Sequence, residues 1–204
     1  MPNLAYFKRF ILVSLLAMTW SCPAAGILGE LWQNDSAATN ASIVPTGVAD
    51  AEFYSSGIDY DTRLSGYTPA QFFNNPSFFN TSAGFNPAGS LDNTYVRFTG
   101  QLFLNSGVNT FSVPHDDGAI LSIAGIGTVL SQPGPTSAVT NTFNVTAPSS
   151  GLYNFTLEYG ECAGPPAVLR FDVNGTIVGV PEPSSFLLCS AGLVVTLLAT
   201  KRRL

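Results

Sequence analysis

The feature that most constrains the fold of this chain is a series of short runs rich in β-branched and aromatic residues, separated by turn residues. A first run is at 26–32, and the others are at 95–104, 108–113, 119–124, 142–145, 152–159, 167–173 and 176–178. Short runs at this spacing are typical of an all-β sandwich. Between the two ends of the chain, no segment shows sustained helical periodicity. We therefore expect an all-β fold, an antiparallel β-sandwich.

Turn residues between the runs support this interpretation. Asn174-Gly175 stands between the last two runs, and both residue types tolerate positive φ, so the pair predicts a two-residue hairpin. Gly107, Gly151 and the Gly-Pro pairs around 132–135 mark further loops.

The region 55–90 is less regular and is rich in Asn, Pro, Ser and Phe. Its phenylalanines make it too apolar for a free linker. We expect a long loop that packs over the sandwich, with one helical turn. Two roles are open for the aromatic side chains, the core or a platform on which sugars stack, and the core is the commoner use. The residues concerned are Phe72, Phe73, Phe78 and Phe79.

Charge excludes some classes of partner. Between residues 26 and 179 the basic residues are Arg63, Arg97 and Arg170, and there is no lysine. Nucleic-acid binding needs clustered Lys and Arg to neutralise phosphates, so we expect no nucleic-acid partner. The same balance disfavours anionic lipid headgroups, whereas an acidic surface suits cations such as Ca²⁺.

The N-terminal end has the three parts of a secretory signal peptide. Lys8 and Arg9 precede an apolar run at 10–20, and small residues follow at Ala24 and Ala25. We therefore assign 1–25 to a signal peptide and 26–179 to the folded domain.

The C-terminal end, 180–204, carries a motif, an apolar run at about 186–199 and a basic tail. The motif consists of Val180, Pro181, Glu182 and Pro183, and the basic tail of Lys201, Arg202 and Arg203. The apolar run is short for a membrane span but long enough to cross a thin bilayer, and we expect its basic flank on the cytoplasmic side. A plain transmembrane anchor is one interpretation of this segment.

The order of the three parts also resembles the PEP-CTERM sorting signal of Gram-negative bacteria that make exopolysaccharide. That resemblance implies processing by the membrane enzyme exosortase. The transmembrane helix would then insert into the inner membrane only transiently. The mature protein would be secreted, or displayed on the cell surface or in the extracellular matrix.

The cysteines exclude an internal disulfide in the folded domain. Cys22 lies in the signal peptide and Cys189 in the C-terminal segment, so Cys162 is the one cysteine of the domain. It is either buried as a small apolar residue or paired with another molecule, and burial is the commoner state of free cysteine.

The stretch "FSVPHDDGAILSIAG" places Asp116 and Asp117 side by side between two predicted strands. Asp-Asp-Gly by itself is typical of a turn. Two adjacent carboxylates repel each other, however, and a divalent cation relieves the repulsion. His115, the single histidine, is expected to be a loop residue beside the pair, because no partner for a zinc site or a catalytic triad stands at a visible spacing.

Two longer stretches carry a resemblance to a known family. They are "VRFTGQLFLNSGVNTFSVPHDDGAILSIAGIGTVL" and "SGLYNFTLEYGECAGPPAVLRF", with "GELW" near the start of the domain. Together they resemble the PA-fourteen domain, named after anthrax protective antigen. This family is a β-sandwich found in toxins, glycosidases, yeast flocculins and bacterial adhesins.

The resemblance implies a site. In sugar-binding members, two adjacent aspartates joined by a cis peptide hold one Ca²⁺, and the ion ligates vicinal hydroxyls of a glycan. Asp116 and Asp117 would be metal ligands, and together with Gly118 they would form the glycan-binding site. Gly118 would also let the chain turn away from the pair. The expected turn 160–165 offers Glu161 as a further metal ligand, although the asparagine of the flocculin pattern is missing there.

These observations predict a secreted or surface-displayed, lectin-like carbohydrate-binding module. It would depend on calcium and attach to the cell surface or to exopolysaccharide. The alternatives are a structural matrix protein without a metal and an ice-binding surface protein. We do not expect an enzyme, because glycoside hydrolysis needs two carboxylates about 5 Å or more apart across a sugar, whereas adjacent aspartates converge on one cation.

Overall fold

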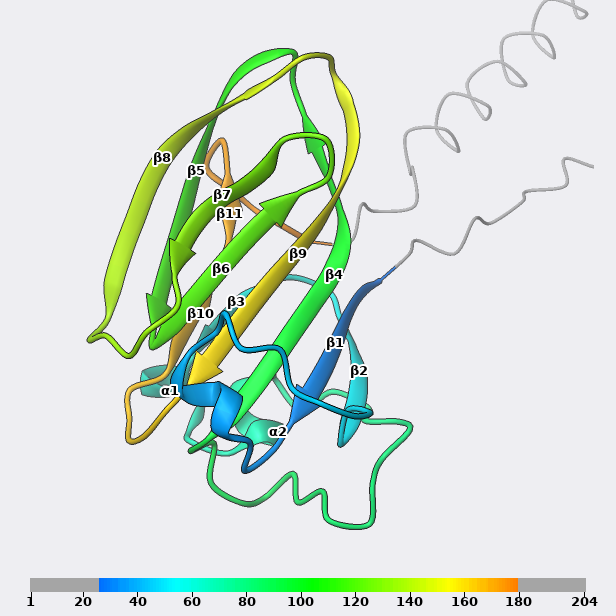
Figure 1. Ribbon diagram of the computed structural model, residues 1–204, viewed down its shortest axis with the longest axis vertical. Coiled ribbons are helices and arrows are strands. Elements are labelled where there is room, and N and C mark those ends of the chain that lie inside the picture. The colour runs from blue at the N-terminus through cyan, green and yellow to red at the C-terminus, as the bar shows by residue number, and fades with distance from the viewer. Residues whose placement is uncertain (1–25, 180–204) are drawn as a thin grey trace, which may run out of the picture.

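The computed structural model describes residues 26–179, which form two antiparallel β-sheets packed face to face (Figure 1). The expected signal peptide, sorting motif and basic tail lie outside the described residues. The strands are β1 (Ile27–Trp32), β2 (Ala51–Ser55), β3 (Asp59–Asp61), β4 (Thr94–Leu104), β5 (Gly107–Asp116), β6 (Gly118–Ile123), β7 (Gly127–Gln132), β8 (Val139–Ala147), β9 (Gly151–Glu161), β10 (Val168–Arg170), β11 (Asp172–Val173) and β12 (Thr176–Ile177). The expected all-β class is confirmed.

Short helices connect some of the strands. They are the 3-10 helix η1 (Ser36–Thr39) and the single-turn α-helices α1 (Thr62–Ser65) and α2 (Pro69–Phe72). No helix within 26–179 has the length and apolar character needed to cross a bilayer.

The first sheet has the strand order β2-β1-β4-β9-β6-β7. Its centre is the long pair of β4 and β9, which runs in unbroken register from Thr94 opposite Glu161 to Leu104 opposite Gly151. Neither β2 nor β7 was expected from the sequence. Strand β7 lies at the edge, and only Leu130 of its side chains is buried, so its residues show no clear alternation.

The second sheet is built around β5, which pairs with β8 on one side and with β10 and then β11 on the other. The single strand expected at 167–173 is therefore divided in two. Phe171 leaves the ladder because its N–H donates to the carbonyl of Ile58 and its own carbonyl accepts from Val178. The hairpin predicted at Asn174-Gly175 is present between β11 and β12, and both residues have positive φ.

The core lies between the sheets, and the irregular region closes one end of it (Figure 1). Asp61 caps α1, and Thr68 caps α2 with Pro69 in its first turn, so the expected helical turn is present twice. These turns direct Phe72 and Phe73 into the core.

The aromatic side chains of this region are mainly core residues. Phe72 and Phe73 are almost fully buried and pack with Phe53, Tyr60 and Phe98. The next two phenylalanines are half-buried, with Phe78 against Phe53 and Phe79 against Tyr54. The core interpretation therefore holds for the first pair.

Candidate metal and glycan site

The two aspartates stand where the chain crosses from one sheet to the other. Asp116 ends β5 in the second sheet, and Gly118 begins β6 in the first sheet. A single residue, Asp117, therefore makes the connection, and the peptide bond between Asp116 and Asp117 is cis. The chain crosses between the two layers here without a separate loop.

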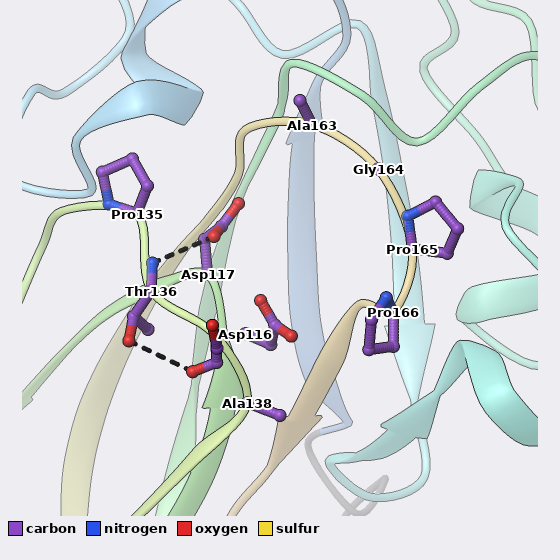
Figure 2. A pocket seen from close by; sticks show the side chains of 10 residues that line it. Asp116, Asp117, Pro135, Thr136, Ala138, Ala163, Gly164, Pro165 and Pro166 are labelled. Carbon is purple, nitrogen blue, oxygen red and sulfur yellow. Dashed lines mark hydrogen bonds between the residues drawn. The ribbon is translucent and has the colours of Figure 1, made fainter.

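An open pocket of about 640 Å³ lies over this crossing. Its walls are two loops that are distant in sequence, 133–138 between β7 and β8 and 162–167 between β9 and β10. Figure 2 shows both aspartates between these loops. The lining residues are Asp116, Asp117, Pro135, Thr136, Ser137, Ala138, Ala163, Gly164, Pro165 and Pro166. Small and neutral side chains thus surround an acidic floor.

The carboxylate of Asp117 ties both walls to the crossing. One oxygen accepts a hydrogen bond from the backbone N–H of Thr136 (3.0 Å), and the other accepts one from the N–H of Cys162 (2.8 Å). Each oxygen keeps a further lone pair for another partner. Cys162 itself is half-buried with a free thiol, so its expected burial is only partial.

The carboxyl group of Asp116 is in an unfavourable electrostatic position. Burial, together with the negative charge of Asp117, raises the pKa of Asp116 to about 6. A cation beside the pair would offset both causes, because it favours the ionised form of each carboxyl group. The pair can therefore bind a hard cation such as Ca²⁺, which prefers oxygen ligands.

No group of three or more His, Cys, Asp or Glu side chains within residues 26–179 is arranged to hold a metal. A calcium ion at this site would take its remaining ligands from backbone carbonyls, from water or from a bound molecule. Such a site would keep coordination positions open to ligand hydroxyls.

The structure does not bring Glu161 to the pocket. The turn was expected to begin at Gly160, but β9 continues through Glu161, and strand alternation turns this side chain inward with that of Tyr159. The carboxyl group has no exposed surface and lies within hydrogen-bond distance of the hydroxyls of Tyr67 (2.8 Å) and Tyr159 (2.7 Å). Burial raises the pKa of Glu161 to about 8.

His115 is not the loop residue that was expected. It belongs to β5, which continues to Asp116, and it is fully buried. Its Nδ1 is 2.5 Å from the backbone carbonyl oxygen of Asp117, and its Nε2 is 2.8 Å from the amide nitrogen of Asn141. Burial lowers the pKa of His115. The side chain therefore contacts the crossing from inside the sandwich.

Gly118 has a different role from the expected one. Its backbone does not adopt the left-handed conformation, so the turn does not require glycine. A Cβ atom at this position would overlap the carbonyl oxygen of Pro133. Gly118 instead allows the loop 133–138 to approach the crossing closely.

Sequence reasoning missed several residues of the site. Tyr159 donates a hydrogen bond to the backbone carbonyl of Asp116, and Asn141 contacts His115. Asp92 accepts from the N–H of Gly164 (2.8 Å) and thereby fixes one wall of the pocket. The alternation of β9 could have shown that Tyr159 faces inward, but nothing local marks Asn141 or Asp92.

No family model matches the sequence, and no curated protein matches it. Solved structures with the same fold include the PA14 domain of the antifreeze protein MpAFP, with a TM-score of 0.60 and 20% identity over 76% of this chain and 86% of that one. The PA14 sugar-binding domain from an RTX adhesin has a TM-score of 0.55 and 24% identity over 76% and 93% of the two chains.

A third structure is the Epithelial Adhesin 6 A domain from Candida glabrata, in complex with Galb1-3GlcNAc. Its TM-score is 0.50, with 12% identity over 76% of this chain and 84% of that one. The fold of residues 26–179 is therefore that of a PA14 β-sandwich, as the sequence resemblance implied.

Proposed function

We propose that this protein is a secreted or surface-displayed carbohydrate-binding module, in which Asp116 and Asp117 hold a calcium ion that ligates glycan hydroxyls. The observation that carries the proposal is that two consecutive aspartates line the floor of an open pocket. Structures with the same fold that are named as sugar-binding or adhesin domains add support. Its biological role would be attachment to the cell surface or to an exopolysaccharide matrix.

The donor set fits calcium better than a transition metal. Carboxylate and carbonyl oxygens suit Ca²⁺, whereas zinc and copper sites use His and Cys. His115 offers no free ring nitrogen to the pocket, because both nitrogens already have partners. Asp116 and Asp117 would hold the ion, which would supply a positive charge and open coordination positions.

We also propose that the site binds its ligand without catalysis. Hydrolysis of a glycosidic bond uses two carboxyl groups on opposite sides of a sugar, about 5 Å or more apart. Here the two carboxyl groups come from consecutive residues, and the nearby carboxyl group of Glu161 is enclosed in the core.

A glycan array tests the function directly. The secreted protein should bind a subset of glycans with calcium present, and binding should disappear with chelator or in Asp117→Ala. Binding that survives both changes would sink the calcium mechanism and leave a calcium-independent lectin. No binding to any glycan, including the producer's own exopolysaccharide, would favour the structural matrix protein.

Ice binding is the weaker alternative. The likeness to a PA14 domain of an antifreeze protein is the reason to test it. Thermal hysteresis in a solution of the purified protein is the relevant measurement. A clear hysteresis gap that persists in Asp117→Ala would favour ice binding over the lectin function.

Export and sorting form a separate part of the proposal. The motif Val180–Pro183 and the tail Lys201–Arg203 would direct the chain to exosortase after transient insertion in the inner membrane of a Gram-negative bacterium. The mass of the protein recovered from the cell surface tests this. If the surface protein retains Lys201 to Leu204, exosortase processing is wrong and the plain transmembrane anchor is the remaining interpretation.

A further inference from the structure

The backbone carbonyls of both aspartates are held by buried side chains. The hydroxyl of Tyr159 donates to the carbonyl oxygen of Asp116, and Nδ1 of His115 lies 2.5 Å from the carbonyl oxygen of Asp117. Neither Tyr159 nor His115 has any exposed surface, and neither belongs to the lining of the pocket. Tyr159 belongs to the first sheet and His115 to the second, so the crossing is fixed from both layers.

The partners of His115 define its protonation state. A carbonyl oxygen can only accept, so Nδ1 carries a proton and donates it to Asp117. The amide nitrogen of Asn141 can only donate, so Nε2 of His115 accepts and carries no proton. The amide of Gln132 donates to the side-chain oxygen of Asn141 (3.2 Å) and orients that group. The imidazole is therefore neutral, in one tautomer.

Holding these two carbonyls constrains the two carboxylates. The peptide planes on either side of each Cα set the direction in which its side chain leaves the backbone. Groups that orient metal ligands without touching the metal affect affinity strongly, because the ligands then need no rearrangement when the ion binds.

We propose that Tyr159 and His115 are positioning residues that hold Asp116 and Asp117 in the orientation needed to bind calcium. The inference rests on the proposed calcium function of the pair. Tyr159 acts through the carbonyl of Asp116, and His115 acts through the carbonyl of Asp117. Neither residue lines the pocket, so neither would touch the ion or the glycan.

The test measures ion binding in the secreted protein and in matched variants. Calcium titration calorimetry gives the Kd, and terbium luminescence lifetimes in H₂O and D₂O give the number of water molecules on an ion in the site. In Tyr159→Phe the calcium Kd should rise about 10- to 100-fold. The terbium ion should also carry more water, because a misdirected carboxylate leaves a coordination position open.

The His115 variants distinguish positioning from packing. His115→Asn retains an amide N–H at a similar distance from the backbone to Nδ1, whereas His115→Leu retains only bulk. The Asn variant should bind calcium more tightly than the Leu variant. If both fail to fold, as judged by cooperative melting in chelator, Tyr159→Phe alone decides.

Tyr153→Phe is the control for Tyr159→Phe. It is also on β9 and removes a hydroxyl that donates to a backbone carbonyl, that of Ser149 (2.9 Å), outside the pocket. Its calcium Kd should equal that of the unmodified protein. If the unmodified protein binds calcium and Tyr159→Phe has the same Kd and the same water count, the positioning role is wrong but the calcium mechanism stands. Absence of calcium binding in the unmodified protein would overturn both this role and the calcium mechanism.

Discussion

Two acidic regions lie at the same end of the sandwich, and they differ in their exposure to solvent. Asp116 and Asp117 face an open pocket, and Asp117 accepts hydrogen bonds from two backbone N–H groups. Glu161 is enclosed in the core, where its partners are the hydroxyls of Tyr67 and Tyr159. A cation from solvent could reach the pair, whereas only a proton could neutralise the enclosed acid.

The number of protons available for hydrogen bonds around Tyr159 also favours a neutral Glu161. The hydroxyl of Tyr159 lies against two acceptors, the carbonyl of Asp116 and the carboxyl group of Glu161, but it has one proton. If Glu161 is protonated, it donates to Tyr159, and the hydroxyl proton remains for Asp116. The neutral form of the buried acid therefore supports the backbone beneath the charged pair.

The largest expected effect concerns the pH dependence of stability through Glu161. Its pKa in the folded state, about 8, is above the ordinary value of 4.5, so folding is favoured by its protonated form. This contribution is fully present below pH 4.5 and is lost as the pH rises through 8. Between pH 5 and 9 the loss should be on the order of 4 kcal/mol.

Urea unfolding in chelator at several pH values measures this dependence. Glu161→Gln should remove most of it, because glutamine donates and accepts as the neutral acid does but does not ionise. Above pH 8 this variant should be more stable than the unmodified protein. Equal slopes for both proteins would show that Glu161 does not carry a proton in the core.

The second effect concerns the pair and calcium. Because an ion that binds only the folded state stabilises it, calcium at 100 times its Kd should add about 2.7 kcal/mol to the free energy of unfolding. The double variant Asp116→Asn with Asp117→Asn should lose this response completely. In chelator the same variant should differ little in stability from the unmodified protein. The repulsion between the two carboxylates is gone, but asparagine at position 117 can accept from only one of the two backbone N–H groups.

Melting curves recorded with calcium and with chelator measure the calcium response and the stability of the metal-free protein. If the unmodified protein melts at the same temperature in the two conditions, the metal site is wrong. A double variant that still responds to calcium would place the ion elsewhere.

The smallest effect concerns the link between the two regions. The hydroxyl of Tyr67 contacts both Asp92 (2.7 Å) and Glu161 (2.8 Å), and Asp92 holds the wall of the pocket at Gly164. Tyr67→Phe should lower the free energy of unfolding by about 1 kcal/mol. Its calcium Kd should stay within about twofold of the original, since Asp92 still accepts from Gly164. A large loss of calcium affinity in this variant would show that the contacts of the buried Glu161 affect calcium binding by the aspartate pair.

The sequence by itself determined the features that depend on neighbouring residues. Alternation of apolar and polar side chains specified the long strands β4, β5 and β9, because strand period two is a local property. Asn174-Gly175 specified the last hairpin through its tolerance of positive φ. The adjacent aspartates marked the crossing between two strands.

Tertiary structure decided which groups surround those aspartates. Three contacts define the site, and their partners stand far apart in the chain: Thr136 and Cys162 are 19 and 45 residues from Asp117, and Tyr159 is 43 residues from Asp116. The inward position of Glu161 depends on β9 continuing along β4 to Thr94. No local pattern specifies such pairings, because they exist only once the two sheets are stacked and their connecting loops meet at one end.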